Sequence, residues 1–440
     1  MQLSRRKFFT LAGASAAGTL LMSPLEALIA RKANGQLVEG YGSLVTDPNG
    51  LLDLPPGFQY RAFSRTGDLM SDGSLVPGNH DGMAAFRGPR NTVILVRNHE
   101  LSPTSGTQVQ GQYPYDSRAR GGTTTLVVSR NRQLIRDFAS LSGTIRNCAG
   151  GPTPWSSWIT CEEDVTRPSP QGVILYHGYN FEVPSYATSP IQPVALVDMG
   201  RFNHEAVAVD PKTGIVYQTE DRGDSLFYRF IPNKFPRKYG DLQAGGKLQA
   251  LKIKGQPPTV NTSNSGFKPG EKWDAEWVDI PNPNPLDGDT VRFQGQQLGA
   301  ATFARGEGIW WGNGELYFCC TSGGAQGLGQ VWRYIPGATP AQGGIIELFV
   351  ESTSADELQA PDNIVVSPHG DLILCEDGSG TDYLVGVTPQ GKLYQLARNP
   401  FNGSEFAGAC FSPDGNTLYV NIQSPGITFA IWGPWKSRKA

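Results

Sequence analysis

The stretch Trp155-Ser-Ser-Trp-Ile-Thr-Cys161-Glu162-Glu163-Asp164 shows how this chain is built. Residues 155–160 alternate aromatic and polar side chains, which is the period-two pattern of a half-buried β-strand. The strand runs directly into a thiol followed by three acids. Because functional residues are often held at the ends of rigid elements, we expect this strand to deliver its last side chains to a site.

Four other short β-like runs also end in polar or thiol residues. They are 93–97 before Asn98-His99-Glu100, 215–219 before Glu220-Asp221, 316–318 before Cys319-Cys320, and 372–374 before Cys375-Glu376-Asp377. One acidic strand end is typical of an ordinary surface, but a recurring set indicates acids that converge. Such acids repel by about 1 kcal/mol per pair in water and about 4 kcal/mol near a protein surface, so the cluster would need cations.

A loose strand–turn–strand repeat accounts for the spacing of these ends. Its clearest copies are 204–217, 361–374 and 409–420, and looser copies lie at 86–100 and 306–320. Most strand ends recur at intervals near or just above the roughly 40–50 residues of a four-stranded propeller blade. We therefore predict an all-β, six-bladed β-propeller with a central metal channel. Two stacked β-sandwiches are the alternative, but radial repetition explains both the period and the acidic ends.

We expect a single domain over residues 31–440, with an insertion or long crossing loop around 234–300. The chain has 440 residues, of which 54 are glycine and 33 proline, and this composition favours many turns in a large β-rich core. The net charge is −3, and no basic stripe is present that would bind nucleic acid. We therefore expect no nucleic-acid partner.

The metal chemistry follows from the residue types available. The chain has only five histidines, and its six cysteines contain no C-x-x-C pair, which argues against a structural zinc site and a disulfide framework. Carboxylate and amide ligands are plentiful. They favour hard cations, with calcium the most natural and iron plausible where a thiolate takes part.

The N-terminus is typical of a twin-arginine export signal. Ser4-Arg5-Arg6-Lys7-Phe8-Phe9 precedes an apolar, Ala- and Gly-rich stretch from Leu11 to Met22. An amphipathic first helix with a chance arginine pair is the alternative. The stretch is too short for a permanent span, and no other segment approaches about 20 apolar residues. We expect residues 1–30 to be read by the twin-arginine machinery, and the remainder to be a periplasmic or secreted monomer without stable membrane insertion.

Arg305-Gly306-Glu307-Gly308 adds a cation beside an acid. A guanidinium next to metal ions suits a phosphate clamp, because its paired N–H groups bind phosphoryl oxygens and stabilise charge in the transition state. A structural Arg–Glu pair between blades is the alternative interpretation.

Taken together, the motifs of this chain resemble the PhoX-type alkaline phosphatases over nearly the whole length after the signal. The motifs are the twin-arginine start, Tyr41-Gly42, Leu51-Leu-Asp-Leu-Pro-Pro-Gly57-Phe58, Asp81-Gly-Met-Ala-Ala-Phe86, Asn98-His99-Glu100, Cys161-Glu162-Glu163, Gly200-Arg-Phe-Asn-His-Glu205-Ala206, Thr219-Glu220-Asp221, Arg305-Gly-Glu307-Gly308 and Pro413-Asp-Gly415 through Asn421-Ile-Gln-Ser-Pro425-Gly426.

The resemblance implies a channel that holds Fe³⁺ and Ca²⁺ in one multinuclear cluster with a bridging oxo group. It implies Cys161 as the thiolate ligand of an iron and Arg305 as the phosphate clamp. The implied metal ligands are Glu220, Glu307, Glu376 and Asp377, with Glu100, Glu162, Glu205 and Asp221 as further candidates. The implied reaction is hydrolysis of small phosphate monoesters, with diesters as a second class, by a metal-bound oxo or hydroxide group.

Two other functions compete with this interpretation. A calcium-dependent propeller lactonase or esterase would also place amides such as Asn98, Asn203 and Asn363 around a central metal. The contexts of Cys161 and Arg305 do not suit it, because a lactone carries no dianion to clamp. A non-catalytic propeller that binds another protein on its face would need no central metals.

Overall fold

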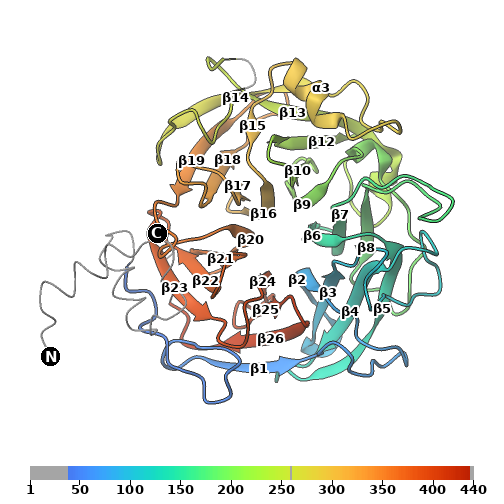
Figure 1. Cartoon of the computed structure of the whole chain (residues 1–440), viewed down its shortest axis with the longest axis vertical. Coiled ribbons are helices and arrows are strands. Elements are labelled where there is room, and N and C mark those ends of the chain that lie inside the picture. Colours follow the sequence, from blue (N-terminus) through green and yellow to red (C-terminus); the bar gives the residue numbers. More distant parts are fainter. Residues whose placement is uncertain (1–37, 258–259, 437–440) are drawn as a thin grey trace, which may run out of the picture.

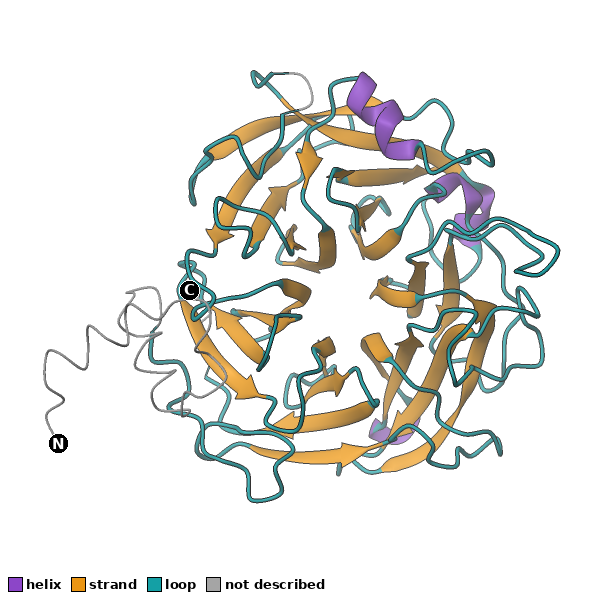
Figure 2. Ribbon diagram, in the orientation of Figure 1, coloured by secondary structure: helices purple, strands orange, loops and turns teal. Residues whose placement is uncertain are grey.

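The computed structural model describes residues 38–257 and 260–436, so the expected export signal lies outside the described residues. Within these ranges the regular secondary structure is almost all β-strand, and the sheets are arranged radially around a central axis (Figures 1 and 2). The one described α-helix, α3 (Val291–Gln297), lies at the rim. None of the described helices is long and apolar enough to cross a membrane.

Six short strands surround the axis, and each lies next to its neighbour so that the ring closes (Figure 1). They are β2 (His80–Arg87), β6 (Asn147–Pro152), β9 (His204–Val209), β16 (Gly306–Gly312), β20 (Pro361–Val366) and β24 (Phe406–Phe411). The packing between them is tight. A Cβ atom at Gly82 would lie 2.6 Å from the Cα atom of Ala149, and one at Gly308 would lie 2.7 Å from the Cα atom of Asn363. Only glycine allows this close approach of two backbones.

Four of the innermost strands begin a separate antiparallel sheet. The sheets are β2 with β3 (Val93–His99), β4 (Gly121–Val128) and β5 (Leu134–Thr144); β6 with β7 (Ser157–Glu162) and β8 (Asn180–Pro184); β20 with β21 (Leu372–Glu376), β22 (Tyr383–Val387) and β23 (Leu393–Arg398); and β24 with β25 (Leu418–Ile422), β26 (Ile427–Trp432) and β1 (Gln59–Phe63). Since β1 comes first in the chain and β26 last, their pairing from Gln59↔Trp432 to Phe63↔Thr428 closes the ring.

The other two innermost strands share one nine-stranded sheet. It runs from β9 through β10 (Val216–Glu220), β12 (Tyr228–Pro232), β13 (Gly246–Ile253) and β14 (Lys272–Asp279) to β19 (Ile345–Glu351), β18 (Gln330–Ile335), β17 (Glu315–Cys320) and β16. The join is the short pairing Lys272↔Glu347 to Asp274↔Ile345. The all-β, propeller-like arrangement is thus confirmed, but the sheets are not six separate blades.

The segment 234–300, which we expected to be an insertion or crossing loop, contains β13 and β14 of this large sheet. The same segment also contains α3, and a two-stranded sheet of β11 (Ser225–Leu226) and β15 (Thr302–Phe303) lies beside it. The hydrophobic core lies between neighbouring sheets. Leu126 of β4, for example, packs in one cluster with Tyr419 of β25. Burial of such side chains fixes the sheets around the axis.

Candidate metal centre and active site

Each innermost strand carries the same β-bulge at its start. In β2, His80 pairs with His99 and Met83 with Arg97, so β2 has one more residue than its partner between these pairs. The other five strands show the same shift. A bulge bends the strand and re-aims a side chain, and bulges are common beside active sites. The residue that follows the first bulge pair is Asp81, Cys148, Glu205, Glu307, Asp362 or Gly408.

Each innermost strand and the strand paired with it form one unit of the ring, and the second strand places a residue opposite the bulge. The residues opposite the start of the bulge are His99, Glu162, Glu220, Cys320, Glu376 and Asn421. Each is buried. The next residue in four of these units is an acid, and these acids are Glu100, Glu163, Asp221 and Asp377. Where two acids are adjacent, the second, such as Glu163 or Asp377, belongs to a group of potential ligand atoms, and the first does not.

The buried members of these pairs hold loops. Glu162 accepts hydrogen bonds from the backbone N–H groups of Ile145 (2.9 Å) and Gly178 (2.8 Å). Glu376 likewise accepts from the N–H groups of Gln359 (2.9 Å) and Tyr383 (3.0 Å). These carboxylates are occupied by backbone donors, so the structure does not bring them together with the ligand-type side chains described next.

Glu220 is the third predicted ligand of this kind. Its Oε2 atom accepts a hydrogen bond from the hydroxyl of Tyr228 at 2.7 Å, and its Oε1 atom lies 3.8 Å from a guanidinium nitrogen of Arg292. Burial raises the pKa of Glu220 to about 8, and the Tyr228 and Arg292 contacts act in the opposite direction. Glu220 therefore lies among side chains of its own sheet and of α3, apart from the ligand-type groups.

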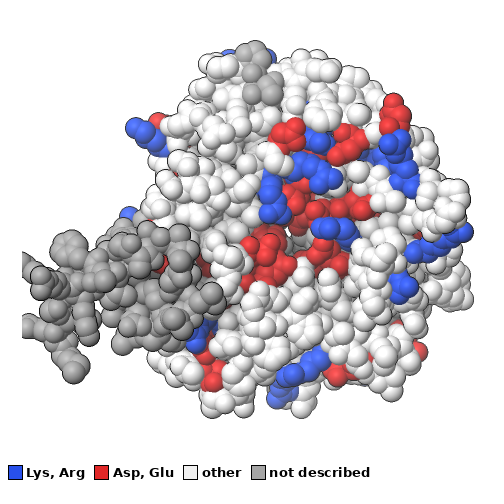
Figure 3. Space-filling model, viewed as in Figure 1, with Lys and Arg blue, Asp and Glu red and all other residues white. Residues whose placement is uncertain are grey.

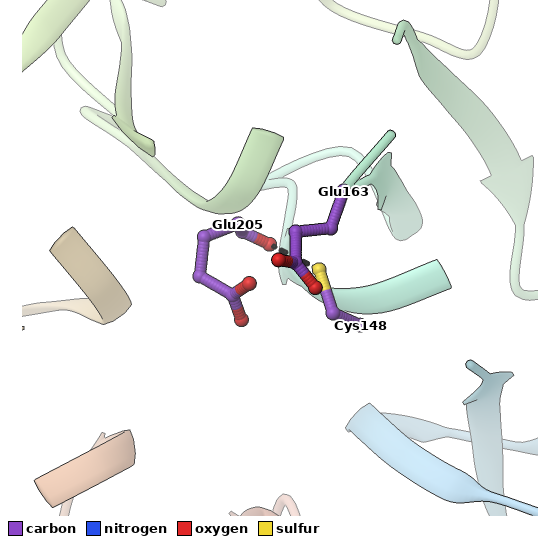
Figure 4. A group of neighbouring side chains, drawn as sticks. All are labelled: Cys148, Glu163 and Glu205. Carbon is purple, nitrogen blue, oxygen red and sulfur yellow. Dashed lines mark hydrogen bonds between the residues drawn. The ribbon is translucent and has the colours of Figure 1, made fainter. Parts of the chain in front are cut away.

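Three groups of potential ligand atoms line the channel. They are Cys148–Glu163–Glu205, Glu205–Glu307–Asp362 and Asp362–Asp377–Glu405, and in each group the atoms lie within 4.8 Å of one another. Glu205 and Asp362 each belong to two groups, so the three form one continuous series. Figure 4 shows the first group, with the Cys148 thiol and the Glu163 and Glu205 carboxyl groups converging from three elements.

Cys161 does not take part in this series. It lies within β7 and packs against Ile159 and Val207 in an apolar cluster, with none of its surface exposed. Cys148 belongs to the same cluster, but it lies at the β6 bulge, and its sulfur, unlike that of Cys161, is within 4.8 Å of channel carboxylate oxygens in the described groups. Burial raises the pKa of the Cys148 thiol, and the neighbouring carboxyl of Glu205 raises it further. A bound cation would reverse this, since a coordinating thiol is deprotonated.

The carboxyl groups that we call the channel acids are Asp81, Glu100, Glu163, Glu205, Asp221, Glu307, Asp362, Asp377 and Glu405. Burial and mutual repulsion raise the pKa of Glu163 to about 8, and burial with the charge of Asp377 raises the pKa of Asp362 to about 7. Charged side chains gather at the centre of the face in Figure 3. Several carboxylates and one thiol fit multivalent cations, because oxygen donors suit hard ions and the thiol suits iron.

Two guanidinium groups accompany the channel acids. Arg305 donates from Nε to Asp221 (2.8 Å) and from Nη2 to both Asp221 (2.9 Å) and Glu307 (2.9 Å). Arg146 donates from Nη2 to Glu163, and the same nitrogen forms an ion pair with Glu100 at 2.7 Å. The structure thus brings together the predicted residues Glu100, Glu205, Asp221, Arg305, Glu307 and Asp377. Sequence reasoning missed Asp81, Arg146, Cys148, Glu163, Asp362 and Glu405.

A signal for two of the missed residues, Asp81 and Cys148, is present in the sequence. An acid or thiol followed by a small residue recurs as Asp81-Gly82, Cys148-Ala149, Glu205-Ala206 and Glu307-Gly308. At Gly82 and Gly308 the next innermost strand leaves no room for a Cβ atom. This pattern marks the bulge of each unit.

The fold and the channel together define a class of protein, an all-β propeller-like protein whose channel is lined with side chains of the metal-ligand type. The family model for alkaline phosphatase PhoX matches residues 39–426, so the chain belongs to the alkaline phosphatase PhoX family. It is accordingly a metal-dependent phosphatase, a phosphoric monoester hydrolase.

Comparison with solved structures agrees with the fold. The chain is similar to Pseudomonas fluorescens PhoX in complex with vanadate, a transition state analogue, with 18% identity, a TM-score of 0.66, and coverage of 87% of this chain and 96% of that one. A gluconolactonase from Xanthomonas campestris shares 14% identity at a TM-score of 0.38, covering 84% and 92%. A protein of unknown function from Bacteroides thetaiotaomicron shares 10% at 0.45, covering 85% and 76%. No curated protein matches the sequence.

Proposed function

We propose that this chain is an exported, calcium- and iron-dependent alkaline phosphatase that releases inorganic phosphate from small phosphate monoesters, with diesters as a second class. The observation that carries the proposal is the continuous series of channel acids that begins at the Cys148 thiol. Such a series offers many hard oxygen donors and a single soft ligand at one end. That combination suits calcium along the series and iron at the thiol.

We assign the metal ligands by position. Cys148, Glu163 and Glu205 would hold iron, and Glu307, Asp362, Asp377 and Glu405 would hold the calcium ions, with Asp81, Glu100 and Asp221 as further ligands. Glu162 and Glu376 keep their hydrogen bonds to loop N–H groups, and Glu220 keeps its contacts with Tyr228 and Arg292. When bound, the cations would supply positive charge to the phosphoryl oxygens and lower the pKa of water.

Arg305 is the proposed phosphate clamp. Its side chain is 39% exposed, and its guanidinium lies between Asp221 and Glu307 at the channel. Cations that neutralise these two carboxylates would weaken their hold on Arg305. The guanidinium then binds a non-bridging phosphoryl oxygen through two N–H groups, which fixes the orientation of the ester and stabilises charge that develops during transfer.

We also propose a single domain over residues 31–440 that acts as a monomer. In this proposal the nine-stranded sheet counts as two fused blades, so that six blades surround the channel, and residues 1–30 direct export. Replacing Arg5 and Arg6 together by Lys tests the last point, because the receptor reads the arginine pair and not its charge alone. Fractionation should then find the precursor in the cytoplasm, and normal secretion would contradict the export proposal.

Elemental analysis combined with an activity assay tests the central proposal. Protein purified from its native export route should contain both iron and calcium, and it should hydrolyse p-nitrophenyl phosphate. Exhaustive chelation should abolish turnover, and added calcium should restore it. Full phosphatase activity after chelation would contradict the proposed metal centre. Calcium alone, together with lactone hydrolysis, would favour a lactonase instead.

A further inference from the structure

Arg146 and Arg305 occupy equivalent positions in two units of the ring. Each is the residue immediately before an innermost strand, β6 for Arg146 and β16 for Arg305. Both have left-handed backbones, with φ of 46° and 55°. Asn79, before β2, has the same conformation with φ of 48°. The left-handed region costs most non-glycine residues about 1–2 kcal/mol but is tolerated by Asn. Ala360, before β20, shares this conformation with φ of 47°, so the left-handed backbone belongs to this position in the ring, and the two arginines are distinguished by where their side chains lie.

The surroundings of the two arginines are also alike. Arg146 bridges Glu100, which follows β3, and Glu163, which follows β7. Arg305 bridges Asp221, which follows β10, and Glu307 of β16. The exposed fractions of the two side chains are 41% and 39%. Each guanidinium therefore joins channel acids from two strands, and each side chain is partly exposed to solvent.

The Arg146 guanidinium has unused donors. Its Nε atom is buried without a hydrogen-bond partner among the described residues, so the N–H groups left for a ligand that enters from solvent are those on the terminal nitrogens. The two bridged carboxylates are bound through Nη2 alone. An Arg fork with only one nitrogen engaged has capacity left for a second acceptor, and phosphate oxygens match the geometry of such a fork.

We propose that Arg146 is a second substrate-binding guanidinium, which contacts the phosphoryl group from a different side of the channel than Arg305. This inference rests on the proposed function and specifies its substrate class. A phosphate monoester at alkaline pH is a dianion with three non-bridging oxygens, whereas a diester is a monoanion with two. Two guanidinium groups therefore favour the monoester, and Arg146 contributes to discrimination against the diester.

The test uses Arg146→Asn, because Asn is found in the same conformation at the equivalent position 79. Arg90→Asn is the matched control. Arg90 is exposed, has φ of 53°, and lies in the turn that joins β2 to β3, at the end of β2 remote from the channel. Full-length, metal-loaded proteins are compared by metal content, by calorimetric titration with inorganic phosphate, and by steady-state kinetics on p-nitrophenyl phosphate and bis(p-nitrophenyl) phosphate.

We expect Arg146→Asn to weaken phosphate binding by about 10- to 100-fold, the loss of one charge-assisted contact. The KM for the monoester should rise by a similar factor, and the KM for the diester should rise less. The metal content of the variant should equal that of the unaltered protein. Arg90→Asn should behave as the unaltered protein. Unchanged phosphate affinity together with an unchanged monoester-to-diester ratio would overturn the proposal.

Two further outcomes separate the possible causes. If Arg146→Asn fails to fold or loses its metals, Arg146→Lys keeps the charge but not the fork. Its phosphate affinity should still fall, and an unaltered affinity would assign Arg146 a structural role. If the unaltered, metal-loaded protein neither binds phosphate nor hydrolyses either ester, the proposed function itself fails, irrespective of Arg146.

Discussion

At the scale of single residues, the position of a thiol in its strand decides its chemistry. All six cysteines are buried and free, and burial raises the pKa of each of them. We therefore expect none of the six thiols to be deprotonated in the absence of a bound cation. Cys148 is the one whose sulfur lies among carboxylates in the described groups of ligand-type atoms. A cation bound there would take the Cys148 sulfur as a ligand and would deprotonate it.

Paired substitutions separate Cys148 from Cys161. We expect Cys148→Ala to lose bound iron and any visible thiolate-to-iron charge-transfer band, because the soft ligand is removed. Cys161→Ala should keep its iron and lose about 1 kcal/mol of the free energy of unfolding through poorer packing. Elemental analysis, visible absorption and urea unfolding provide the measurements. Iron lost from Cys161→Ala and kept by Cys148→Ala would instead restore the sequence-based assignment.

At the scale of elements, the sequence predicted the strand ends well but not the direction of each side chain. The repeated acids after 215–219 and 372–374 do end buried strands at the channel, as alternation and spacing indicated. Which member of Glu376-Asp377 faces the channel depends on the register with β20, where Pro361 pairs with Glu376. Register and bulges arise from pairing between distant strands, so a local pattern cannot fix them.

The same limit explains why the sequence analysis missed Cys148 and Asp362. Neither follows the long apolar run that signals a strand end, since each lies near the start of a short innermost strand. The extra residue of the bulge turns these side chains to the channel. A prediction from strict alternation of side chains along a strand does not allow for such an extra residue. The fusion of two sheets through β14 was missed for a related reason, because a Pro- and Asn-rich segment with only short strands resembles a loop.

The adjacent acids Glu376 and Asp377 should respond in opposite ways to substitution. Glu376→Ala leaves the N–H groups of Gln359 and Tyr383 without their acceptor, so we expect a loss of about 2–4 kcal/mol in the free energy of unfolding. Asp377→Ala removes a carboxyl whose pKa is raised by burial and by Asp221, so the metal-free fold should not be weakened.

Urea unfolding of the metal-free proteins measures the first effect, and metal content measures the second. Asp377→Ala should bind less metal than the unaltered protein. Glu376→Ala should bind the same amount as the unaltered protein under conditions in which this variant is folded. Equal destabilisation by the two substitutions would contradict a structural role for Glu376 and a metal-binding role for Asp377.

At the scale of the whole molecule, the channel exists only when the ring is closed. The channel acids come from separate units of the sequence between Asp81 and Glu405, and the pairing of β1 with β26 joins the last unit to the start of the chain. The repulsion among these acids therefore opposes closure, whereas bound cations favour it. Metal binding and folding are thus coupled through the same carboxyl groups.

This coupling predicts how pH affects the metal-free protein. The pKa values of Glu163, about 8, and Asp362, about 7, lie above their ordinary values of 4.5 and 3.8. Between the ordinary and the raised values the folded chain binds more protons than the unfolded chain, so stability falls as pH rises through this window. Calcium competes with protons for the same oxygens and should stabilise more strongly as pH rises.

We therefore expect the Tm of the chelated protein to be higher near pH 5 than near pH 8, and the Tm increase on adding calcium to be larger near pH 8. Thermal unfolding across this range, with chelator or with excess calcium, measures both. Asp362→Asn removes one of the repelling carboxyls and should flatten the decline of the chelated protein. If the chelated protein instead became more stable with rising pH, the channel acids would ionise without penalty, and repulsion among them could not be what cations relieve.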